Sequence, residues 1–589
     1  MNNYSSPQST YSPRLCPAAA PREKPASATR PAARGLLTLL VAVILAIFPA
    51  GCSSINGNGF QNYIGPAQQH EAATAGATHA PTGVTAGQVK RAAALGLPAR
   101  GPIRLGVAKA IVLALNNNPA LAVQRYYPAI THTQVQVQRA AFDPTITGQV
   151  SAGRSSTLSD AQAYSFAQTN TGNGQAAIQE FFPTGTTVAA NINTNINQSP
   201  FYGNTITSTR VGLTVTQALL QGADINANLA AIHEAQAQTR ITEYQLRGLA
   251  QQITAQTEQA YWNYALAAQD IAIVQQALTV ARQQRDQTQA MVRVGQTAAS
   301  QIPAAQAQVA LEKEALIAAR GTQQTDRLAL LNLVSPPGPR LWRRRVALVN
   351  KPFVPKGRIG PVDSHVDVAM RMRPDLNEAR LEIQRGDLAV VQTRNGLLPV
   401  LNFFINLGKT GYANSFGGTL KHLNGSGYDV TGGLQGSYPL INRAARANYL
   451  SARLTRDQDE ASLRNLEQTV QLDVQDAYIT VQTDRAEIAA TRATEVSQAE
   501  ALRAQIALFD VGNSTSLLVA QAQSNLLSAK IGEVQAVVSY LNALAELYLL
   551  DGSLLQRRGI AAPGWAPPAL PGYLRTKRDV VEQRIVSHQ

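Results

Sequence analysis

Cysteine is almost absent from this chain of 589 residues, which contains only Cys16 and Cys52. If the N-terminal segment is removed as a secretion signal, as argued below, Cys16 leaves with it and no disulfide can form in the mature chain. The seven histidines are scattered, with neither the His-x-x-x-His nor the cysteine spacing that is typical of zinc sites. No P-loop and no nucleophile elbow occurs either. These absences argue against an enzyme, and we expect no catalytic residue, no metal site and no cofactor.

Charged residues are also scarce. They make up 15% of the chain, whereas hydrophobic residues make up 45%. This composition is too apolar for a disordered chain and too polar for a helical membrane protein. The net charge of +14 raises the question of nucleic acid. One basic cluster, "RLWRRRVALVNKPFVPKGR" from Arg340, is Pro-rich and lacks a helix-turn-helix or RNA-binding signature, so we interpret it as an irregular, solvated linker and expect no nucleic acid as partner.

The other basic cluster precedes the apolar run "GLLTLLVAVILAIFPAGC" near the N-terminus. Basic residues followed by a short apolar stretch are typical of a secretory signal, and a run of about 16 residues is short for a membrane span of roughly 20. A retained N-terminal anchor is the alternative. The run ends at Ala50-Gly51-Cys52, which resembles a bacterial lipoprotein lipobox except that Pro49 stands where leucine is preferred. The resemblance implies lipidation at Cys52, and Ser53 implies the outer membrane.

The remainder of the chain contains an internal sequence repeat. Pro144 in "AAFDPTI" and Pro399 in "GLLPVLN" differ by 255 positions, whereas Tyr261 in "EQAYWNY" and Tyr478 in "QDAYITV" differ by 217. The first half is therefore longer by 38 residues between Pro144 and Tyr261. We assign most of this difference to a polar surface loop around "SSTLSDAQAYSFAQTNTGNGQ", because surface loops tolerate insertions of this size.

These observations divide the chain into six parts. We expect a signal peptide with lipobox (1–52), a flexible spacer (53–100), a first repeat (101–335), a basic Pro-rich linker (336–360), a second repeat (361–552) and a C-terminal tail (553–589).

Each repeat begins with an amphipathic helix that a proline interrupts, and two strands follow. In "TTVAANINTNIN", apolar Val188 and Ile192 alternate with asparagine and threonine, which predicts a strand with one apolar and one polar face. "RVGLTVTQ", "PVLNFFINLG" and "GYDVTGGLQGSYPL" have the same pattern. Four strands open at both edges invite aggregation, and a membrane barrel needs at least eight strands to close. The chain therefore has to share its sheet with copies of itself, and three copies would give twelve strands.

Very long helices are predicted after the strands. No proline occurs between Gln221 and Val294, and about 70 helical residues span roughly 100 Å. Apolar residues at coiled-coil spacing indicate helix-on-helix packing. Each long run is interrupted by Val-Gly, at Gly295 and at Gly512, where glycine supplies a backbone conformation suited to a hairpin tip. We expect Thr297 and Ser514 to cap the returning helices.

The order of helix, two strands, long helix, Val-Gly tip and returning helix, present twice, resembles the TolC family of outer-membrane efflux proteins. The resemblance rests on "LALNNNPAL", on "TQALLQGA" with its counterpart "SYPLINRA", on the paired Ala-Tyr, and on two Val-Gly tips followed by "AQAQ". It covers about residues 100 to 552. It implies a TolC-like homotrimer with two strand-strand-helix-helix repeats per chain, in which a 12-stranded membrane β-barrel continues as a long α-helical barrel.

The resemblance also implies a function and partners. Such a protein is the outer-membrane channel of a tripartite efflux or secretion system. It passively conducts substrates from a periplasmic membrane-fusion adaptor and an inner-membrane pump of RND, ABC or MFS type to the exterior. The β-barrel would contact outer-membrane lipid, and the helical barrel would lie in the periplasm. The adaptor would dock at six tip residues: Val294, Gly295, Thr297, Val511, Gly512 and Ser514.

The gate of this chain differs from that of well-studied relatives. Where those relatives place acidic rings just beyond the tip, this chain has Gln301, Leu518 and Gln521. Arg293 and Asp510 instead stand two residues before the two glycines. We hypothesise that they pair between neighbouring hairpins and hold the closed state, the alternative being two solvated charges near a turn. Phe509, at a position often held by tyrosine, is a third candidate gate residue.

The strongest rival is a structural coiled-coil envelope lipoprotein without a pore. It explains the long helices and Cys52. It does not explain the two-faced strands, whose apolar faces have no partner layer in the sequence.

Overall fold

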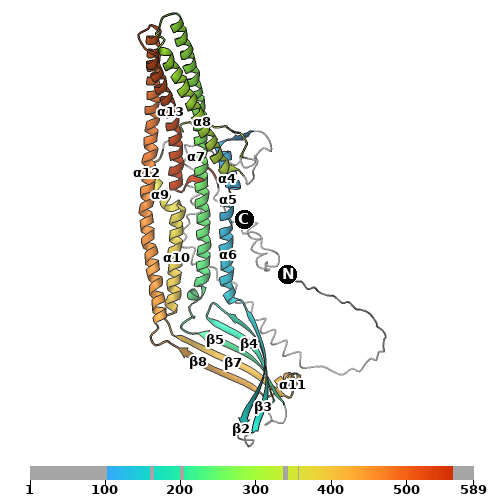
Figure 1. Cartoon of the computed structure of the whole chain (residues 1–589). Helices are drawn as coiled ribbons and strands as arrows, with labels where there is room; N and C mark the ends of the chain where they lie inside the picture. Colours follow the sequence, from blue (N-terminus) through green and yellow to red (C-terminus); the bar gives the residue numbers. More distant parts are fainter. Residues whose placement is uncertain are drawn as a thin grey trace, which may run out of the picture. The chain divides into compact units, whose positions relative to one another are not determined.

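The structure, a computed structural model, describes residues 102–159, 165–198, 205–335, 342–355, 357 and 359–560. All of them lie in one compact unit, Thr78–Gln589. The signal peptide, Cys52, the spacer and the tail beyond residue 560 lie outside the described residues. Within this unit, a β-sheet lies at one end of a set of long helices, and the hairpin tips lie at the other end (Figure 1).

The sheet is a six-stranded antiparallel meander in the order β2-β3-β4-β5-β7-β8. Its strands are β2 (Thr145–Ser159), β3 (Ser165–Phe181), β4 (Thr186–Gln198), β5 (Ile206–Ala218), β7 (Val400–Ala413) and β8 (Tyr428–Ser437). The four predicted strands are confirmed as β4, β5, β7 and β8. The prediction of two strands in the first repeat and of a long polar loop is wrong, because β2 and β3 occupy that region. Glycine, serine, asparagine and glutamine dominate both strands, so their alternation is weak.

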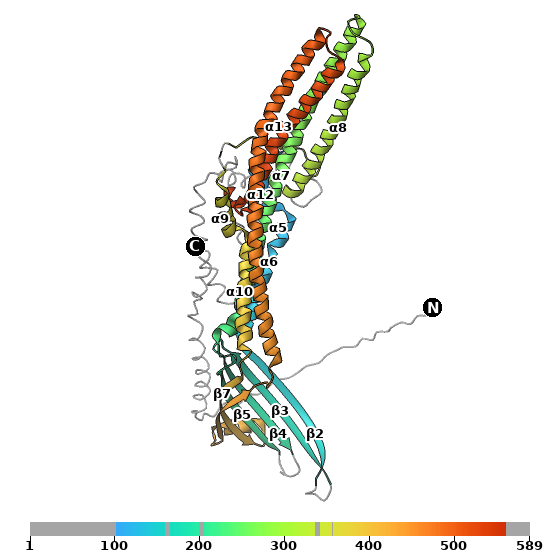
Figure 2. The same ribbon diagram turned by 90° about the vertical axis from the view of Figure 1, so that its left-hand side faces the viewer.

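Two helices run without interruption from the sheet to the tips, as the absence of proline predicts. They are α7 (Ile225–Arg293) and α12 (Arg443–Asp510), of 69 and 68 residues. Each turns back into a returning helix of about half that length, α8 (Gln301–Val334) after α7 and α13 (Ser516–Leu550) after α12. Near the tips the packing order is α8-α7-α13-α12, a single row of four helices (Figure 2).

The half of the row next to the sheet is completed by two other helices, α6 (Tyr126–Arg139) and α10 (Pro374–Asn395). Here the packing order is α6-α7-α10-α12. The predicted proline-interrupted helices precede them: α4 (Val107–Asn117) with α5 (Pro119–Gln124), and α9 (Val362–Met372) before α10. Pro119 and Pro374 each stand at a first helical position, where a missing N–H costs nothing.

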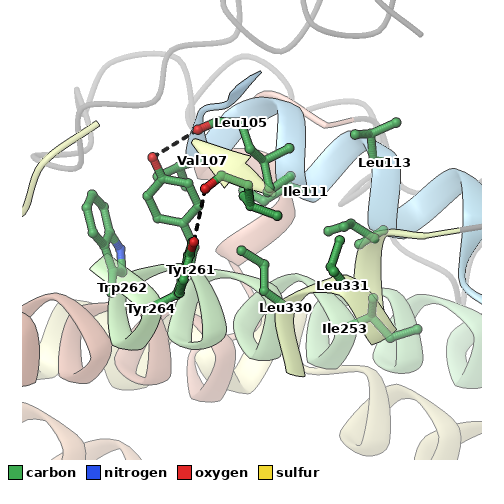
Figure 3. Packing of buried hydrophobic residues seen from close by; sticks show 14 of the residues in the cluster. Leu105, Val107, Ile111, Leu113, Ile253, Tyr261, Trp262, Tyr264, Leu330 and Leu331 are labelled. Atoms are coloured by element: carbon green, nitrogen blue, oxygen red, sulfur yellow. Dashed lines mark hydrogen bonds between the residues drawn. The ribbon is translucent and has the colours of Figure 1, made fainter. Parts of the chain in front are cut away.

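The waist of the row is the region where the returning helices α8 and α13 end. Two short strands cover the hydrophobic core there. β1 (Ile103–Leu105) pairs in parallel with β6 (Val346–Leu348). The basic segment 336–360 is therefore not wholly irregular and solvated, because Val346 pairs with Ile103 and is buried. Tyr261 of the Ala-Tyr motif donates its hydroxyl to the carbonyls of Leu105 and Asn350, at 3.2 Å each. Figure 3 shows Tyr261 and Tyr264 pointing at these strands beside Val107, Ile111 and Leu330.

Beyond residue 552, the predicted end of the second repeat, the described residues 553–560 pack on the same core. α14 (Leu554–Arg557) buries Leu554 and Leu555, and the Arg558 guanidinium forms a fully buried ion pair with Glu258 of α7. A second buried pair, His365 Nδ1 with Asp551 Oδ2 at 2.9 Å, joins α9 to the same segment. These residues follow the last helix of the repeat, so the repeat pattern alone could not place them in the core.

Short elements complete the unit. They are η2 (Ala140–Phe142) before β2, and α11 (Phe416–Lys421) with η4 (His422–Asn424) between β7 and β8. α11 covers the ends of β5 and β7, where the hydroxyls of Thr209 and Thr419 lie 2.6 Å apart. In the part of the chain that the structure describes, no helix combines the length and the hydropathy needed to cross a membrane.

Candidate functional site: hairpin tips and two-faced sheet

The Val-Gly breaks form two identical helix ends. Gly295 and Gly512 have φ values of 76° and 78°, in the left-handed region that favours glycine. At the first tip, Gly295 N–H donates to Val292 O at 3.1 Å and Gln296 N–H donates to Met291 O at 2.9 Å. This pair of hydrogen bonds is the Schellman motif. The same pair of bonds recurs one repeat later, so the prediction that glycine breaks both helices for a hairpin is confirmed.

The predicted caps of the returning helices are wrong. α8 begins at Gln301, four residues after Thr297. α13 is capped by Thr515, whose hydroxyl accepts from Leu518 N–H at 3.3 Å, while Ser514 donates to Gln505 instead. The Schellman turn ends at Gln296 and at Asn513, one residue beyond each glycine, and further turn residues follow it before each returning helix begins.

The tips expose apolar surface. Val294 and Val511 are each 70% exposed, and Leu517 at the start of α13 is 64% exposed. Gly295 and Gly512 are exposed as well, whereas Thr297 and Ser514 are half-buried. Of the six predicted docking residues, four therefore lie on the accessible surface of the tips, and the two hydroxyl residues lie below it.

Polar side chains join the two hairpins just below the tips. Ser516 of α13 donates from its backbone to Gln301 Oε1 of α8 at 3.1 Å, and its hydroxyl bonds the same oxygen at 2.5 Å. Gln287 Nε2 of α7 donates to Asp510 Oδ1 of α12 at 3.0 Å. Near the tips, the hairpins α7–α8 and α12–α13 are thus held together by hydrogen bonds, and Asp510 is an ionisable partner in one of them.

The structure places the three candidate gate residues differently from one another. Asp510 accepts from Gln287, and the ion pairs among the described residues of one chain do not include one with Arg293. The Arg293 guanidinium lies exposed and contacts the carbonyl of Gln289. Phe509 is only 3% exposed, so it packs between helices and does not face solvent within one chain.

The sheet has two chemically distinct faces. A cross-strand row on one face is apolar on all six strands: Ile146, Ile178, Ala190, Leu213, Leu407 and Val430. The adjacent row on the other face is polar apart from one alanine: Thr145, Gln179, Ala189, Thr214, Asn406 and Thr431. Ile146 and Val430 at the two edges are 80% and 65% exposed in the single chain. Such a pairing of faces is typical of a barrel wall between lipid and an aqueous lumen.

An ion pair that the sequence reasoning missed spans the polar face. Arg210 on β5 reaches across β7 to Asp429 on β8, with Nη2 to Oδ2 at 2.6 Å and Nε to Oδ1 at 3.1 Å. Gly408 on β7 makes room for it, since a Cβ there would lie 2.6 Å from Arg210 Nη2. A signal was present in the sequence, because Arg210 and Asp429 are the charged residues of two otherwise neutral strands.

Asp270, a partly buried carboxyl of α7, has a raised pKa. Burial raises the pKa of Asp270 on α7 to about 6, and its Oδ1 atom is buried without a hydrogen-bond partner. Among the residues with described positions, His, Cys, Asp and Glu side chains do not gather in any group of three that could hold a metal ion.

The sequence profile of the outer membrane efflux protein family matches residues 110–335 and 366–553. None of the curated proteins matches the chain by sequence.

Solved structures of outer-membrane channels share the fold. The CmeC outer membrane channel of Campylobacter jejuni is 16% identical, with 76% of this chain and 86% of that chain covered and a TM-score of 0.57. The MtrE outer membrane channel of Neisseria gonorrhoeae, in its open state, is 18% identical over 79% and 94% of the two chains, with a TM-score of 0.53. VceC, an outer membrane protein of Vibrio cholerae, is 16% identical over 78% and 97%, with a TM-score of 0.55.

Proposed function

Since the chain belongs to the outer membrane efflux protein family, we propose that it passively conducts substrates out of the periplasm as the outer-membrane component of a tripartite efflux or secretion system. Proteins of this family are channels and not enzymes. The fold is accordingly TolC-like, a membrane β-barrel with a long α-helical barrel built from three copies.

The observation that carries the proposal is the two-faced sheet. Its apolar face is exposed at the two edge strands and half-buried on β4 and β5, and among the described elements only α11 and the adjoining η4 pack on it, at the ends of β5 and β7. The opposite face is rich in asparagine, glutamine and threonine. In a membrane barrel, lipid contacts the apolar face and a water-filled lumen contacts the polar face. A pore-free coiled-coil lipoprotein would leave the apolar face in water.

The tips supply the docking surface for a periplasmic adaptor in this proposal. Val294 and Val511 present apolar side chains beyond a rigid Schellman turn, in equivalent positions on the two hairpins. An adaptor with six equivalent hairpins could therefore contact all six tips of a trimer in the same way. The pump behind the adaptor is of RND, ABC or MFS type, and lipidation at Cys52 adds a second attachment to the outer membrane.

Pairing of Arg293 with Asp510 remains a proposal for contacts between copies. In one chain, each carries its charge at the surface of its own tip. In a ring of hairpins, Arg293 of one copy would lie near Asp510 of the next. The closed state would then be held by three such pairs, each worth about 0–1 kcal/mol.

The test is single-channel conductance of the full-length protein in a planar bilayer, with the native mass of the same sample measured in parallel. We expect discrete steps from a trimer, with small basal steps if the tips rest closed. A monomer or dimer without conductance would overturn the channel proposal in favour of the coiled-coil lipoprotein.

Docking is tested separately with a matched pair of variants. Val511→Asp places a charge at the exposed tip, and Val349→Asp places one at a similarly exposed valine of the waist (65% exposed). We expect loss of adaptor-dependent substrate export with Val511→Asp only. Equal export by both variants would refute the proposal that the adaptor docks at the tips.

A further inference from the structure

The six-stranded sheet raises a question that the tips do not: how many strands close the barrel. Three copies that contribute four strands each would give twelve, and three copies that contribute all six would give eighteen. We infer that all six strands enter the wall, so that the trimer closes an eighteen-stranded barrel. This inference rests on the proposed channel function and specifies the size of its outer exit.

The extra residues of the first repeat form one complete hairpin. The first half is longer by 38 residues between Pro144 and Tyr261, and β3, its turn and β4 span residues 165–198 of that interval. The sheet order is sequential from β2 to β8, with every neighbouring pair antiparallel. Insertion of two strands preserves the up-and-down alternation. Strands β2 and β8 at the two edges therefore run in opposite directions, and β8 of one copy can pair antiparallel with β2 of the next.

The inserted hairpin has the same two faces as the rest of the sheet. On β3, Ile178 and Ala176 lie on the apolar face, whereas Gln179 and Gln175 lie on the polar face. The charged side chains that the described strands place on the apolar face stand at its margins: Glu180 toward the helices, and Arg154 and Lys409 toward the far ends. A hairpin that protruded into water would not need this alternation in register with its neighbours β2 and β5.

Strand length agrees with a membrane-spanning wall. The six strands have 10 to 17 residues, and a tilted strand needs about 9–11 residues to cross the hydrocarbon region. The 15 residues of β2 and the 17 of β3 are long enough on the same count. Both edge strands carry exposed apolar residues, Ile146 and Val150 on β2 and Leu434 on β8.

The perimeter of the helical part also agrees with eighteen strands. Each chain places four helices in one row beside the sheet, α6, α7, α10 and α12. Three chains give twelve helices, which at about 8–10 Å between axes make a ring of roughly 100–120 Å. At a spacing of about 4.8 Å and a tilt of about 40°, eighteen strands make a ring of roughly 110 Å and twelve strands one of roughly 75 Å. The perimeter of an eighteen-stranded barrel therefore lies within the range of the helical ring.

Two pairs of adjacent alanines test the inserted hairpin. Ala176 and Ala177 are neighbours on β3 with opposite faces, and Ala189 and Ala190 are the same on β4. Each is changed singly to cysteine in the full chain, and the purified protein is reconstituted in phosphatidylcholine vesicles. A charged, membrane-impermeant maleimide then reports water and an apolar maleimide reports lipid. The parent protein supplies the background labelling.

We expect the charged reagent to label Ala177→Cys and Ala189→Cys at least tenfold faster than Ala176→Cys and Ala190→Cys, with the apolar reagent labelling all four. Rapid charged labelling at all four positions would place the hairpin in water and overturn the inference, as would no labelling by either reagent. Native mass of the same samples counts the chains: three chains together with the alternating labelling on β3 and β4 confirm eighteen strands, whereas two chains would give twelve and refute the inference. Conductance in that sample separates this failure from failure of the channel function itself.

Discussion

Gly512 and Gly532 offer a direct test of the hairpin tips. Both have open space where a Cβ would be added, with no atom within 4 Å in the chain. They differ in backbone conformation, since Gly512 ends α12 at φ 78° whereas Gly532 lies inside α13. Replacement of each by alanine therefore adds the same methyl group to the same kind of space, and only the conformation decides the sign of the change in stability.

The magnitudes follow from that difference. A left-handed conformation costs a residue with Cβ about 1–2 kcal/mol, and the loss of glycine's freedom in the unfolded chain offsets about 0.4–1 kcal/mol of it. Gly512→Ala should therefore weaken the tip by about 1 kcal/mol. Gly532→Ala should stabilise α13 by up to about 1 kcal/mol, because alanine is the best helix former. Gly512→Asn should lose less than alanine despite its larger side chain, because asparagine tolerates the left-handed region.

Hydrogen exchange at the tip is the suitable assay, because the tip is far from the main core and opens locally. The Asn513 amide donates to Leu508 O at 2.8 Å in the Schellman turn. With Gly512→Ala its protection should fall about fivefold, since about 1.4 kcal/mol corresponds to tenfold. With Gly532→Ala the tip should exchange as in the parent. Equal protection at Asn513 in the parent and in Gly512→Ala, or an alanine variant more protected than the asparagine variant, would refute the reasoning.

Three further predictions concern the waist and the helices. Burial raises the pKa of Asp270 from 3.8 to about 6. The stabilisation of the folded state by the neutral carboxyl is therefore complete below about pH 4 and is lost as the pH rises through 6. Asp270→Asn should accordingly increase the free energy of unfolding at pH 7.5 by about 1–2 kcal/mol, a figure reduced for solvent screening of the half-exposed group, and so raise the thermal midpoint. At pH 4 the midpoint should be unchanged. An equal shift at both pH values would contradict this. Glu258→Leu should lower the free energy of unfolding by about 3–5 kcal/mol in denaturant, because it leaves the Arg558 guanidinium buried without its carboxylate. Addition of Arg558→Met should recover most of that loss. A double variant no more stable than the single one would argue against the ion pair. Asn118→Ala should lower stability by about 1 kcal/mol through loss of the α5 cap, and Asn118→Asp should retain it; equal melting of the two variants would show that the cap contributes nothing.

Much of the architecture could be predicted because it depends on local or repeated signals. The absence of proline was sufficient for α7. The duplicated Val-Gly was sufficient for both tips, since glycine between two long helical runs usually marks the point where one helix ends. The strands β4, β7 and β8 carry enough aliphatic residues for their alternation to stand out.

The remainder could not be predicted in this way. Strand β3 contains "QTNTGNGQ", in which Gly172 and Gly174 stand on the apolar face without an aliphatic side chain, so composition alone suggests a loop. The buried pairs Glu258–Arg558 and His365–Asp551 join residues 300 and 186 positions apart, and no local pattern links such partners. The cap positions depended on the number of residues in the turn, which differs between the tips, since α8 begins six residues after Gly295 and α13 begins four after Gly512.

The unequal lengths of the helices have a mechanical consequence. α7 and α12 are unbroken struts, whereas the positions beside them are filled by stacked pieces, α8 above α6 and α13 above α10. The two returning helices end at the waist, α8 at Val334 and α13 at Leu550. The tip half and the sheet half of the row are therefore connected by continuous helix at only two of the four positions. A displacement of a tip along α7 or α12 has an unbroken helical path to the sheet, whereas α8 and α13 transmit it only through the side chains packed at the waist.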